Sequence, residues 1–206
     1  MKDLSTRPAT PSEALHELLA GNERFVTGTR VHPHQDAERR TAVAETQQPF
    51  AVVFGCSDSR LAAEIIFDRG LGDLFVVRTA GHIVGPEVSA SIEYGVLVLG
   101  APLLVVLGHD SCGAVLAAHQ ALSGVAPPPS EGLRPIVEGI RPSLQPWTDD
   151  LDAVSTTHVR STVDDLCGCS GIEEAVVAGR CAVVGMTYRL AEGRVTVVTT
   201  YDKSPG

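Results

Sequence analysis

Short apolar runs, each followed by polar residues, recur along this chain and predict its regular structure. The runs at 51–55, 75–78 and 103–107 are rich in β-branched residues and too short for helices, so they predict buried strands. Good helix formers follow the first and the third run, at 61–67 and from Ser111 onward. Strands that alternate with helices in this way are typical of an α/β fold with a mainly parallel central sheet flanked by helices.

Two more strands are predicted near the C-terminus, at 181–188 and 194–200. Only a short turn separates them, so we expect them to pair antiparallel. Pro86 suits the first turn of a helix, which the spacing of apolar residues extends to Val96. Three further helical patterns complete the expected layout, at 131–144, 151–166 and 171–179.

The N-terminal part of the chain, from about residue 11 to residue 48, predicts a helical arm that precedes the first core strand. A helix is expected to start at Pro11, with Ser12 as its N-cap. Apolar residues then follow at roughly helical spacing: Leu15, Leu18, Leu19 and Phe25. Such an arm packs either on the outside of its own domain or across a partner subunit.

Length and composition indicate one globular domain that spans residues 1–206. With 44% hydrophobic residues and a mean hydropathy of +0.13, the chain is able to bury a sizeable core. The three prolines at 127–129 predict a surface loop rather than a linker between domains. We therefore expect a single domain with the helical arm at its N-terminus.

Charge and cysteine usage narrow the function classes. The net charge of −9 argues against a nucleic acid or an anionic membrane surface as a partner. The longest apolar stretch, 94–108, is too short for a bilayer span and is interrupted by glycine and proline. Residues 1–7 do not contain the apolar core of a signal peptide. The chain has five cysteines, and an odd number does not suit a framework of disulfide bonds. We therefore expect a cytoplasmic protein.

Metal-binding side chains follow two of the predicted strands at the point where each strand ends. Cys56 comes directly after the first strand, and His109 and Cys112 follow the third. Because parallel strands end at the same edge of a sheet, we expect these three side chains to converge. Taken singly, each is more readily explained as a buried structural cysteine or a turn histidine. Together, two thiolates and one imidazole predict a zinc site whose fourth position stays open for water or substrate.

These residues resemble the motif of the β-class carbonic anhydrases. The resemblance is carried by Cys56-Ser57-Asp58-Ser59-Arg60, followed by His109 and Cys112. Three further segments extend it over most of the chain, at 21–25, 75–81 and 91–94. It implies a zinc lyase that hydrates CO2 reversibly to bicarbonate and a proton by attack of zinc-bound hydroxide. It also implies one Zn2+ per subunit, bound by Cys56, His109 and Cys112, in a homodimer or homotetramer.

The resemblance further implies roles for residues around the zinc ligands. Asp58 and Arg60 would be the catalytic pair beside the metal. Ionised and held by Arg60, Asp58 orients the nucleophile at CO2; alternatively it swings onto zinc as a fourth ligand and closes the site. A substrate pocket, part of it supplied by the partner subunit, is implied at Gln47, Phe75, Ala80 and Tyr94.

Two other function classes remain open at the level of sequence. A related hydrolase on the same scaffold, acting on carbon disulfide or carbonyl sulfide, would carry the same zinc ligands, so that only substrate assays separate it from a carbonic anhydrase. A non-catalytic, zinc-stabilised binding protein would hold the metal without hydrating CO2. The presence of both Asp58 and Arg60 argues against that second class.

Overall fold

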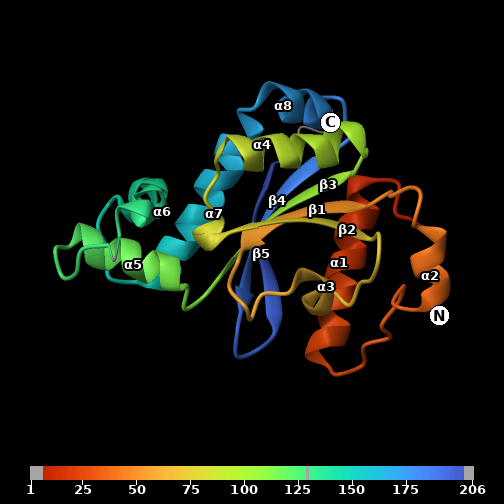
Figure 1. The fold of residues 1–206 in the computed structure, drawn as a ribbon, viewed down its shortest axis with the longest axis horizontal. Coiled ribbons are helices and arrows are strands. Elements are labelled where there is room, and N and C mark those ends of the chain that lie inside the picture. Colours follow the sequence, from red (N-terminus) through yellow and green to blue (C-terminus); the bar gives the residue numbers. More distant parts are fainter. Residues whose placement is uncertain (1–6, 129, 202–206) are drawn as a thin grey trace.

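A five-stranded sheet forms the centre of the fold (Figure 1). The computed structural model describes residues 7–128 and 130–201, so the predictions for residues 1–6 and for Pro129 lie outside the described residues. The strands lie in the order β2-β1-β3-β4-β5; β2, β1, β3 and β4 are parallel, and β5 is antiparallel to β4. Their bounds are β1 Ala51–Cys56, β2 Leu74–Thr79, β3 Leu103–His109, β4 Ala182–Arg189 and β5 Arg194–Tyr201. This arrangement confirms the predicted fold class and the antiparallel C-terminal pair.

The helices of the described chain surround this sheet. None of those in residues 7–128 and 130–201 combines the length and the apolar character that a membrane crossing requires. The helix predicted at 61–67 is shorter than expected, because its first residues form a turn in which the Leu61 N–H donates to the Asp58 carbonyl. The α-helix bounds are α1 Pro11–Val26, α2 Ala37–Ala42, α3 Ala63–Ile66, α4 Pro86–Glu93, α5 Gly113–Leu122, α6 Arg134–Ile140, α7 Leu151–Cys167 and α8 Ser170–Val177.

The segment 131–144, which the sequence predicts as one helix, consists of three short pieces. Turns of 3-10 helix at Glu131–Leu133 and Arg141–Leu144 flank α6. A proline lacks the N–H that an α-helix needs for its bond to the preceding turn, so Pro142 stops α6. The apolar spacing of the segment is helical throughout and does not reveal these divisions.

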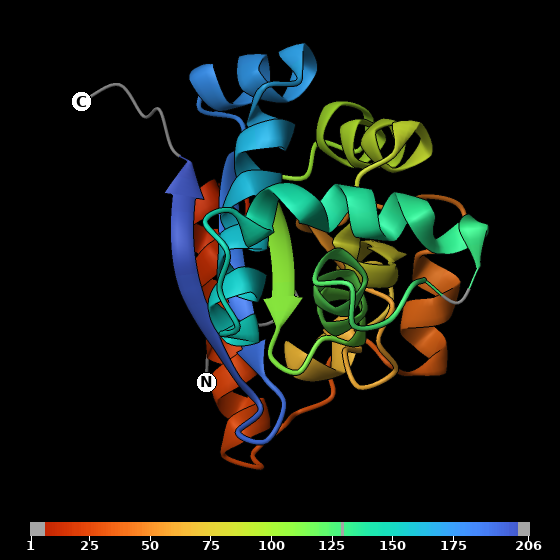
Figure 2. The ribbon, with the colours of Figure 1, turned by 90° about the vertical axis from the view of Figure 1, so that its left-hand side faces the viewer.

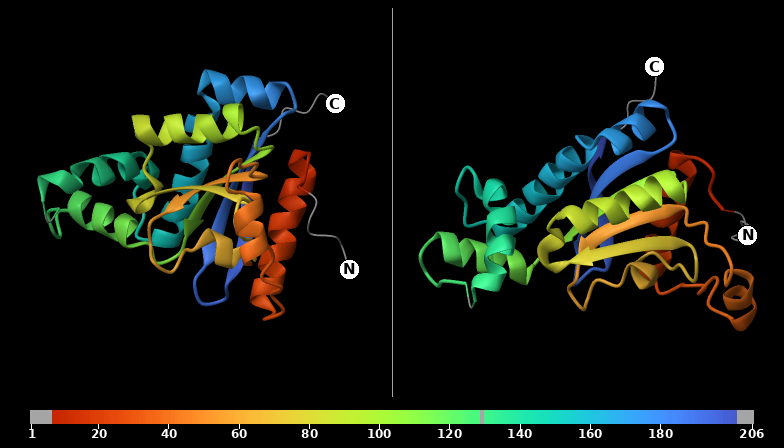
Figure 3. Two further views of the ribbon diagram at one scale, coloured as in Figure 1. Left: turned by 45° about the vertical axis from the view of Figure 1, so that its right-hand side comes forward. Right: turned by 45° about the horizontal axis from the view of Figure 1, so that its top comes forward.

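Helices cover both faces of the sheet, and every residue of β1 and β3 is buried. Side chains alternate between two cores: Val53 and Val105 pack on the side of α1 and α3, whereas Phe54 and Val106 pack on the side of α4, α7 and α8. The strand β5 lies at an outer edge of the sheet (Figure 2). Helices α5 and α6 lie together at one end of the molecule, and α1 and α2 lie at the other end (Figure 3).

The order of the strands determines where a ligand site is expected. β1 lies between β2 and β3. The chain therefore places β2 beside one edge of β1 and later returns to place β3 beside its other edge. Sheets of this kind bind ligands at the carboxyl ends of the two strands where the direction of winding reverses. Those strands are β1 and β3, whose last residues are Cys56 and His109.

Helix α1 is capped by Thr10 and not, as predicted, by Ser12. The Thr10 hydroxyl accepts a hydrogen bond from the Glu13 N–H at 3.2 Å, and the Glu13 carboxylate accepts one from the Thr10 N–H at 3.2 Å. Pro11 takes the first helical position, where its missing N–H is not needed. This reciprocal pair satisfies two backbone donors, which Ser12 is unable to do from inside the first turn.

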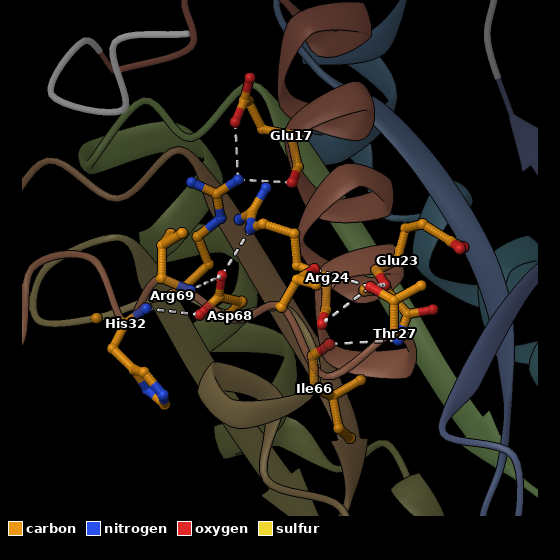
Figure 4. Close-up of polar contacts among 12 residues, drawn as sticks. Glu17, Glu23, Arg24, Thr27, His32, Ile66, Asp68 and Arg69 are labelled. Atoms are coloured by element: carbon orange, nitrogen blue, oxygen red, sulfur yellow. Dashed lines mark hydrogen bonds and ion pairs between the residues drawn. The ribbon is translucent and has the colours of Figure 1, made fainter. Parts of the chain in front are cut away.

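Helix α1 of the N-terminal arm packs on the outside of its own chain. Helix α1 lies against α3 and β5, and two ion pairs hold it there (Figure 4). Arg69 Nη2 donates to the Glu17 carboxylate at 2.8 Å and to the Glu17 carbonyl at 2.6 Å. Arg24 Nε donates to the Asp68 carboxylate at 2.6 Å. The arm is therefore bonded to the residues that directly follow α3.

Replacing Asp68 with Asn is expected to destabilise the domain. Its buried carboxylate also accepts bonds from the N–H groups of Val31 and His32 at 3.1 and 3.0 Å, and an amide replaces these acceptors only in part. We expect D68N to lower the free energy of urea unfolding by about 3 kcal/mol. The control E23Q removes an exposed ion pair with Arg194, at 2.8 Å, and should change the free energy of unfolding by under about 1 kcal/mol. Equal losses in both variants would contradict the prediction.

The same carboxylate makes the stability depend on pH. Burial alone raises the pKa of Asp68, but the bonds from Arg24 and two backbone N–H groups outweigh it and place the pKa below its ordinary value of 3.8. A carboxyl with a depressed pKa stabilises the fold above its unfolded pKa, and that contribution disappears as the pH falls through the folded pKa. This part of the acid dependence should be absent from D68N below about pH 4.

Candidate metal centre

The carboxyl ends of β1 and β3 bring together two cysteines and a histidine. Cys56 ends β1, His109 ends β3, and Cys112 is the N-cap residue of α5. Because β1 and β3 are parallel neighbours, their ends lie at the same edge of the sheet. The three ligand atoms all lie within 4.8 Å of one another, and all three residues are buried. The structure therefore assembles the side chains that the sequence predicts as zinc ligands.

The hydrogen bonds of His109 leave one ring nitrogen available to a metal. Its Nδ1 lies 2.7 Å from the carbonyl oxygen of Asp110, which only accepts, so Nδ1 carries the proton. When the ring is neutral, its Nε2 carries the lone pair that a metal would take. This nitrogen is buried, and no hydrogen-bond partner reaches it from the described part of the chain. A carbonyl that orients the ring in this way is typical of metal-binding histidines.

Cys56, Cys112 and His109 influence one another's pKa values. The Cys112 thiol donates to the Cys56 sulfur, which lowers the pKa of Cys56 in spite of its burial. The same bond, together with burial, raises the pKa of Cys112. Burial alone lowers the pKa of His109, but the adjacent Cys56 sulfur raises it above the ordinary value. A divalent cation displaces such protons, because thiolates and neutral imidazole are the forms that bind metal.

The donor set fits zinc. Thiolate and imidazole ligands select Zn2+, and three protein ligands leave the open position that is typical of catalytic zinc. Mg2+ and Ca2+ prefer oxygen ligands and do not suit two sulfurs. A buried ring nitrogen without a partner is unfavourable, and a metal bound at Nε2 of His109 would satisfy it.

Asp58 and Arg60 form a bidentate ion pair beside these ligands. Arg60 Nε and Nη2 donate to the two carboxylate oxygens at 2.9 and 2.7 Å, and the Arg60 backbone N–H adds a third bond at 2.9 Å. The Arg60 guanidinium holds the pKa of Asp58 well below its usual range, so the carboxylate is ionised. Asp58 Oδ2 lies 4.0 Å from His109 Nε2. An anionic acceptor therefore lies next to the nitrogen that would bind the metal.

Comparison with known proteins identifies the family. A family model described as carbonic anhydrase matches residues 51–195. The chain is 50% identical to the carbonic anhydrase of Mycolicibacterium smegmatis over 192 residues. This match covers 91% of this chain and 93% of that protein. It is 48% identical over 198 residues to carbonic anhydrase 2 of Mycobacterium tuberculosis, covering 94% of each. A tetrameric β-carbonic anhydrase of Sordaria macrospora superposes with a TM-score of 0.71 at 25% identity, covering 91% of this chain and 98% of that one. The chain belongs to the β-class carbonic anhydrase family.

In this β-carbonic anhydrase site, three supporting hydrogen bonds come from two residues to which the sequence assigns no role. Arg78 donates from Nε to the Cys56 carbonyl at 3.0 Å and from Nη2 to the Asp58 carbonyl at 2.6 Å. The Gly81 N–H donates to the Cys56 sulfur at 3.3 Å. Arg78 could have been found from the sequence, because it is a charged residue at the end of an apolar run. The sequence carries no signal for Gly81, because its donor is a backbone group.

The residues predicted to line the carbonic anhydrase substrate pocket are Gln47, Phe75, Ala80 and Tyr94. Ala80 directly precedes Gly81, whose N–H donates to the Cys56 sulfur, so it lies on the side of the cluster within its own chain. Phe75 pairs with Val52, four residues before Cys56, which corresponds to about 13 Å along the strand. Tyr94 packs on Phe75 with ring centroids 6.1 Å apart, and the exposed Gln47 precedes β1. Within one chain, these last three residues lie toward the opposite end of β1 from the cluster.

Proposed function

We propose that this chain is a zinc lyase that catalyses the reversible hydration of CO2 to bicarbonate and a proton. Cys56, His109 and Cys112 would hold one Zn2+ per subunit. The observation that carries the proposal is the buried Nε2 of His109, which lacks a partner among the described residues and lies beside two sulfurs and the ionised Asp58. Membership of the carbonic anhydrase family supports the same activity.

The residues around the site divide the chemical work. When bound, zinc lowers the pKa of a water molecule toward about 7 and so supplies the nucleophile. The Cys56 and Cys112 thiolates cancel the double charge of the cation, which three neutral imidazoles would not do, and this raises the pH at which the nucleophile forms. Asp58, ionised by its contact with Arg60, accepts a hydrogen bond from the nucleophile and directs its lone pair toward CO2.

In this proposal Asp58 acts as a hydrogen-bond acceptor and not as a fourth zinc ligand. Arg60 engages both of its oxygens, at 2.9 and 2.7 Å, which supports the acceptor role. A swing of Asp58 onto zinc would break a bidentate, charge-assisted pair. The site therefore stays open for as long as Arg60 remains paired.

Stopped-flow CO2 hydration by the zinc-loaded protein tests the activity. We expect the rate to rise between pH 7 and pH 8.5, because the two thiolates shift formation of the nucleophile to higher pH. A flat rate from pH 6 to pH 9 would contradict the thiolate argument. Absence of turnover at both pH values, with zinc bound, would contradict CO2 hydration itself. The same assay with carbon disulfide and carbonyl sulfide would then identify a sulfur-substrate hydrolase.

We further propose that the chain works as a homodimer or homotetramer in which two subunits complete each active site. Phe75 and Tyr94 are too far from Cys56 in their own chain to line its pocket, which supports their contribution to a neighbouring subunit. They lie by β2, an edge strand of the sheet. Tyr94 is 46% exposed, and Leu97 and Val98 beside it are 45% and 66% exposed. An apolar surface of this kind is typical of an interface.

Subunit mixing tests the shared site. C56A alone lacks a metal ligand, and Y94A alone lacks a pocket residue that it would give to its partner. In a mixed dimer the metal site of the Y94A subunit faces the intact Tyr94 of the C56A subunit, so one complete site forms. We expect the mixture to exceed the summed activities of the two separate variants. Purely additive activity, or a monomer in sedimentation, would contradict the shared site.

We also propose that residues 1–206 form one domain that acts in the cytoplasm. The two hydrophobic cores lie on opposite faces of the same sheet, which supports a single folding unit. Thiolate zinc ligands must remain reduced, which supports a reducing compartment. The net charge of −9 argues against nucleic acid or an anionic membrane as a partner.

A further inference from the structure

Behind the metal centre, α7 places a buried histidine against the turn that contains Gly81. His158 lies on α7, and its Nε2 is 3.0 Å from the Gly81 carbonyl oxygen. Its Nδ1 is 3.1 Å from the hydroxyl oxygen of Ser143, in the 3-10 turn that follows α6. Both side chains belong to buried residues, each 4% exposed. They connect to the site because the Gly81 N–H donates to the Cys56 sulfur.

The direction of each bond follows from which atoms are able to donate. A carbonyl oxygen only accepts, so His158 Nε2 carries a proton and donates to Gly81. Burial lowers the pKa of His158, which favours the neutral ring. The Nδ1 of this tautomer only accepts, so the Ser143 hydroxyl donates to it. One directed chain of hydrogen bonds therefore runs from Ser143 through His158 and Gly81 to the sulfur of Cys56.

Gly81 has little freedom at this position. Its φ is +66°, in the left-handed region that favours glycine. A Cβ atom at Gly81 would lie 2.9 Å from the Cβ of Ala114 and 3.2 Å from the Cδ1 of Ile140. The same residue accepts from His158 and donates to Cys56, and only two backbone dihedral angles separate the two groups. A change at the carbonyl is therefore transmitted to the N–H.

We propose that His158 and Ser143 are positioning residues for the metal centre, which hold Gly81 so that its N–H stays on the Cys56 sulfur. Donation to a thiolate withdraws charge from the sulfur and restricts the orientation of the side chain. The inference rests on the zinc site proposed above. It adds one residue of α7 and one of the preceding turn to those that determine metal affinity.

A merely structural role of His158 is distinguishable from this one. Its ring also packs on the ring of His82, with centroids 4.3 Å apart. The variant H158F keeps an aromatic ring there and loses the donor, whereas H158Q loses the ring and keeps an amide donor for the Gly81 carbonyl. S143A is a milder change, because it removes only the hydrogen bond from the Ser143 hydroxyl to His158. V163A truncates another buried residue of α7 and leaves all of these hydrogen bonds in place.

The full-length variants are loaded with Co2+ for measurement of the thiolate-to-cobalt charge-transfer absorption, and their Zn2+ affinity is measured by competition with a chromophoric chelator. We expect H158F to shift the absorption to longer wavelength, because the sulfur loses a hydrogen bond. It should weaken Zn2+ binding about tenfold. S143A should change both quantities in the same direction by less. H158Q and V163A should keep the wild-type spectrum.

An unshifted absorption in both H158F and S143A would overturn the proposal. A shift in H158Q without a shift in H158F would also overturn it, because that result would assign the effect to ring packing on His82. A wild-type protein without any thiolate-to-cobalt absorption would refute the metal centre itself. Failure of the positioning role and failure of the proposed function are therefore distinguishable.

Discussion

Cys56→Ala is expected to abolish CO2 hydration and to remove bound zinc from the purified protein. Cys56 supplies one of three ligand atoms that lie within 4.8 Å of one another, and it is the acceptor of the Gly81 N–H. Loss of an outer partner of a metal ligand typically lowers affinity or activity 10–100-fold, so loss of a ligand itself should lower hydration by at least about a hundredfold. Stopped-flow hydration and metal analysis after dialysis measure the two effects.

Cys181→Ala is the matched control for this variant. Cys181 is another buried cysteine, but it belongs to the core on the side of α4, α7 and α8. Burial raises the pKa of its thiol to about 12, so it stays protonated and does not compete for zinc. We expect C181A to retain the metal and most of the activity. Bound zinc and full hydration in C56A would refute the assignment of Cys56.

Asp58→Asn is expected to lower the turnover number about a hundredfold while zinc stays bound. The substitution keeps the shape of the side chain and removes the negative charge that accepts a hydrogen bond from the nucleophile. Arg60→Lys should show a loss in the same direction, because an ammonium group does not reproduce the bidentate contact of a guanidinium. Turnover number, Michaelis constant and zinc content are measured for each variant.

A second bidentate pair in the chain provides the control for these variants. Arg141 Nε and Nη2 donate to the two carboxylate oxygens of Glu138, each at 2.8 Å, on an exposed surface. E138Q therefore removes the same kind of contact without touching the metal centre. We expect its turnover to match the wild type. Wild-type turnover in D58N would show that Asp58 takes no part in the reaction.

The sequence by itself determined the layers of the fold and which side chains are positioned to bind a metal. Strands buried on both faces must be apolar along their whole length, so β1 and β3 are visible as short β-branched runs. β1 and β3 are parallel neighbours, so both end at the same edge of the sheet. This makes the convergence of Cys56, His109 and Cys112 predictable from chain order. Local periodicity and residue chemistry suffice for both conclusions.

Features that depend on contacts between distant segments were decided only by the tertiary structure. Two local features, the end of α6 at Ile140 and the cap at Thr10, are also not revealed by apolar spacing. The register of β2 against β1 places Phe75 far from Cys56, and no pattern within either strand encodes that register. The bond from His158 to Gly81 joins residues 77 positions apart. Backbone groups carry no sequence identity, so a hydrogen bond to one becomes visible only when the chain is folded.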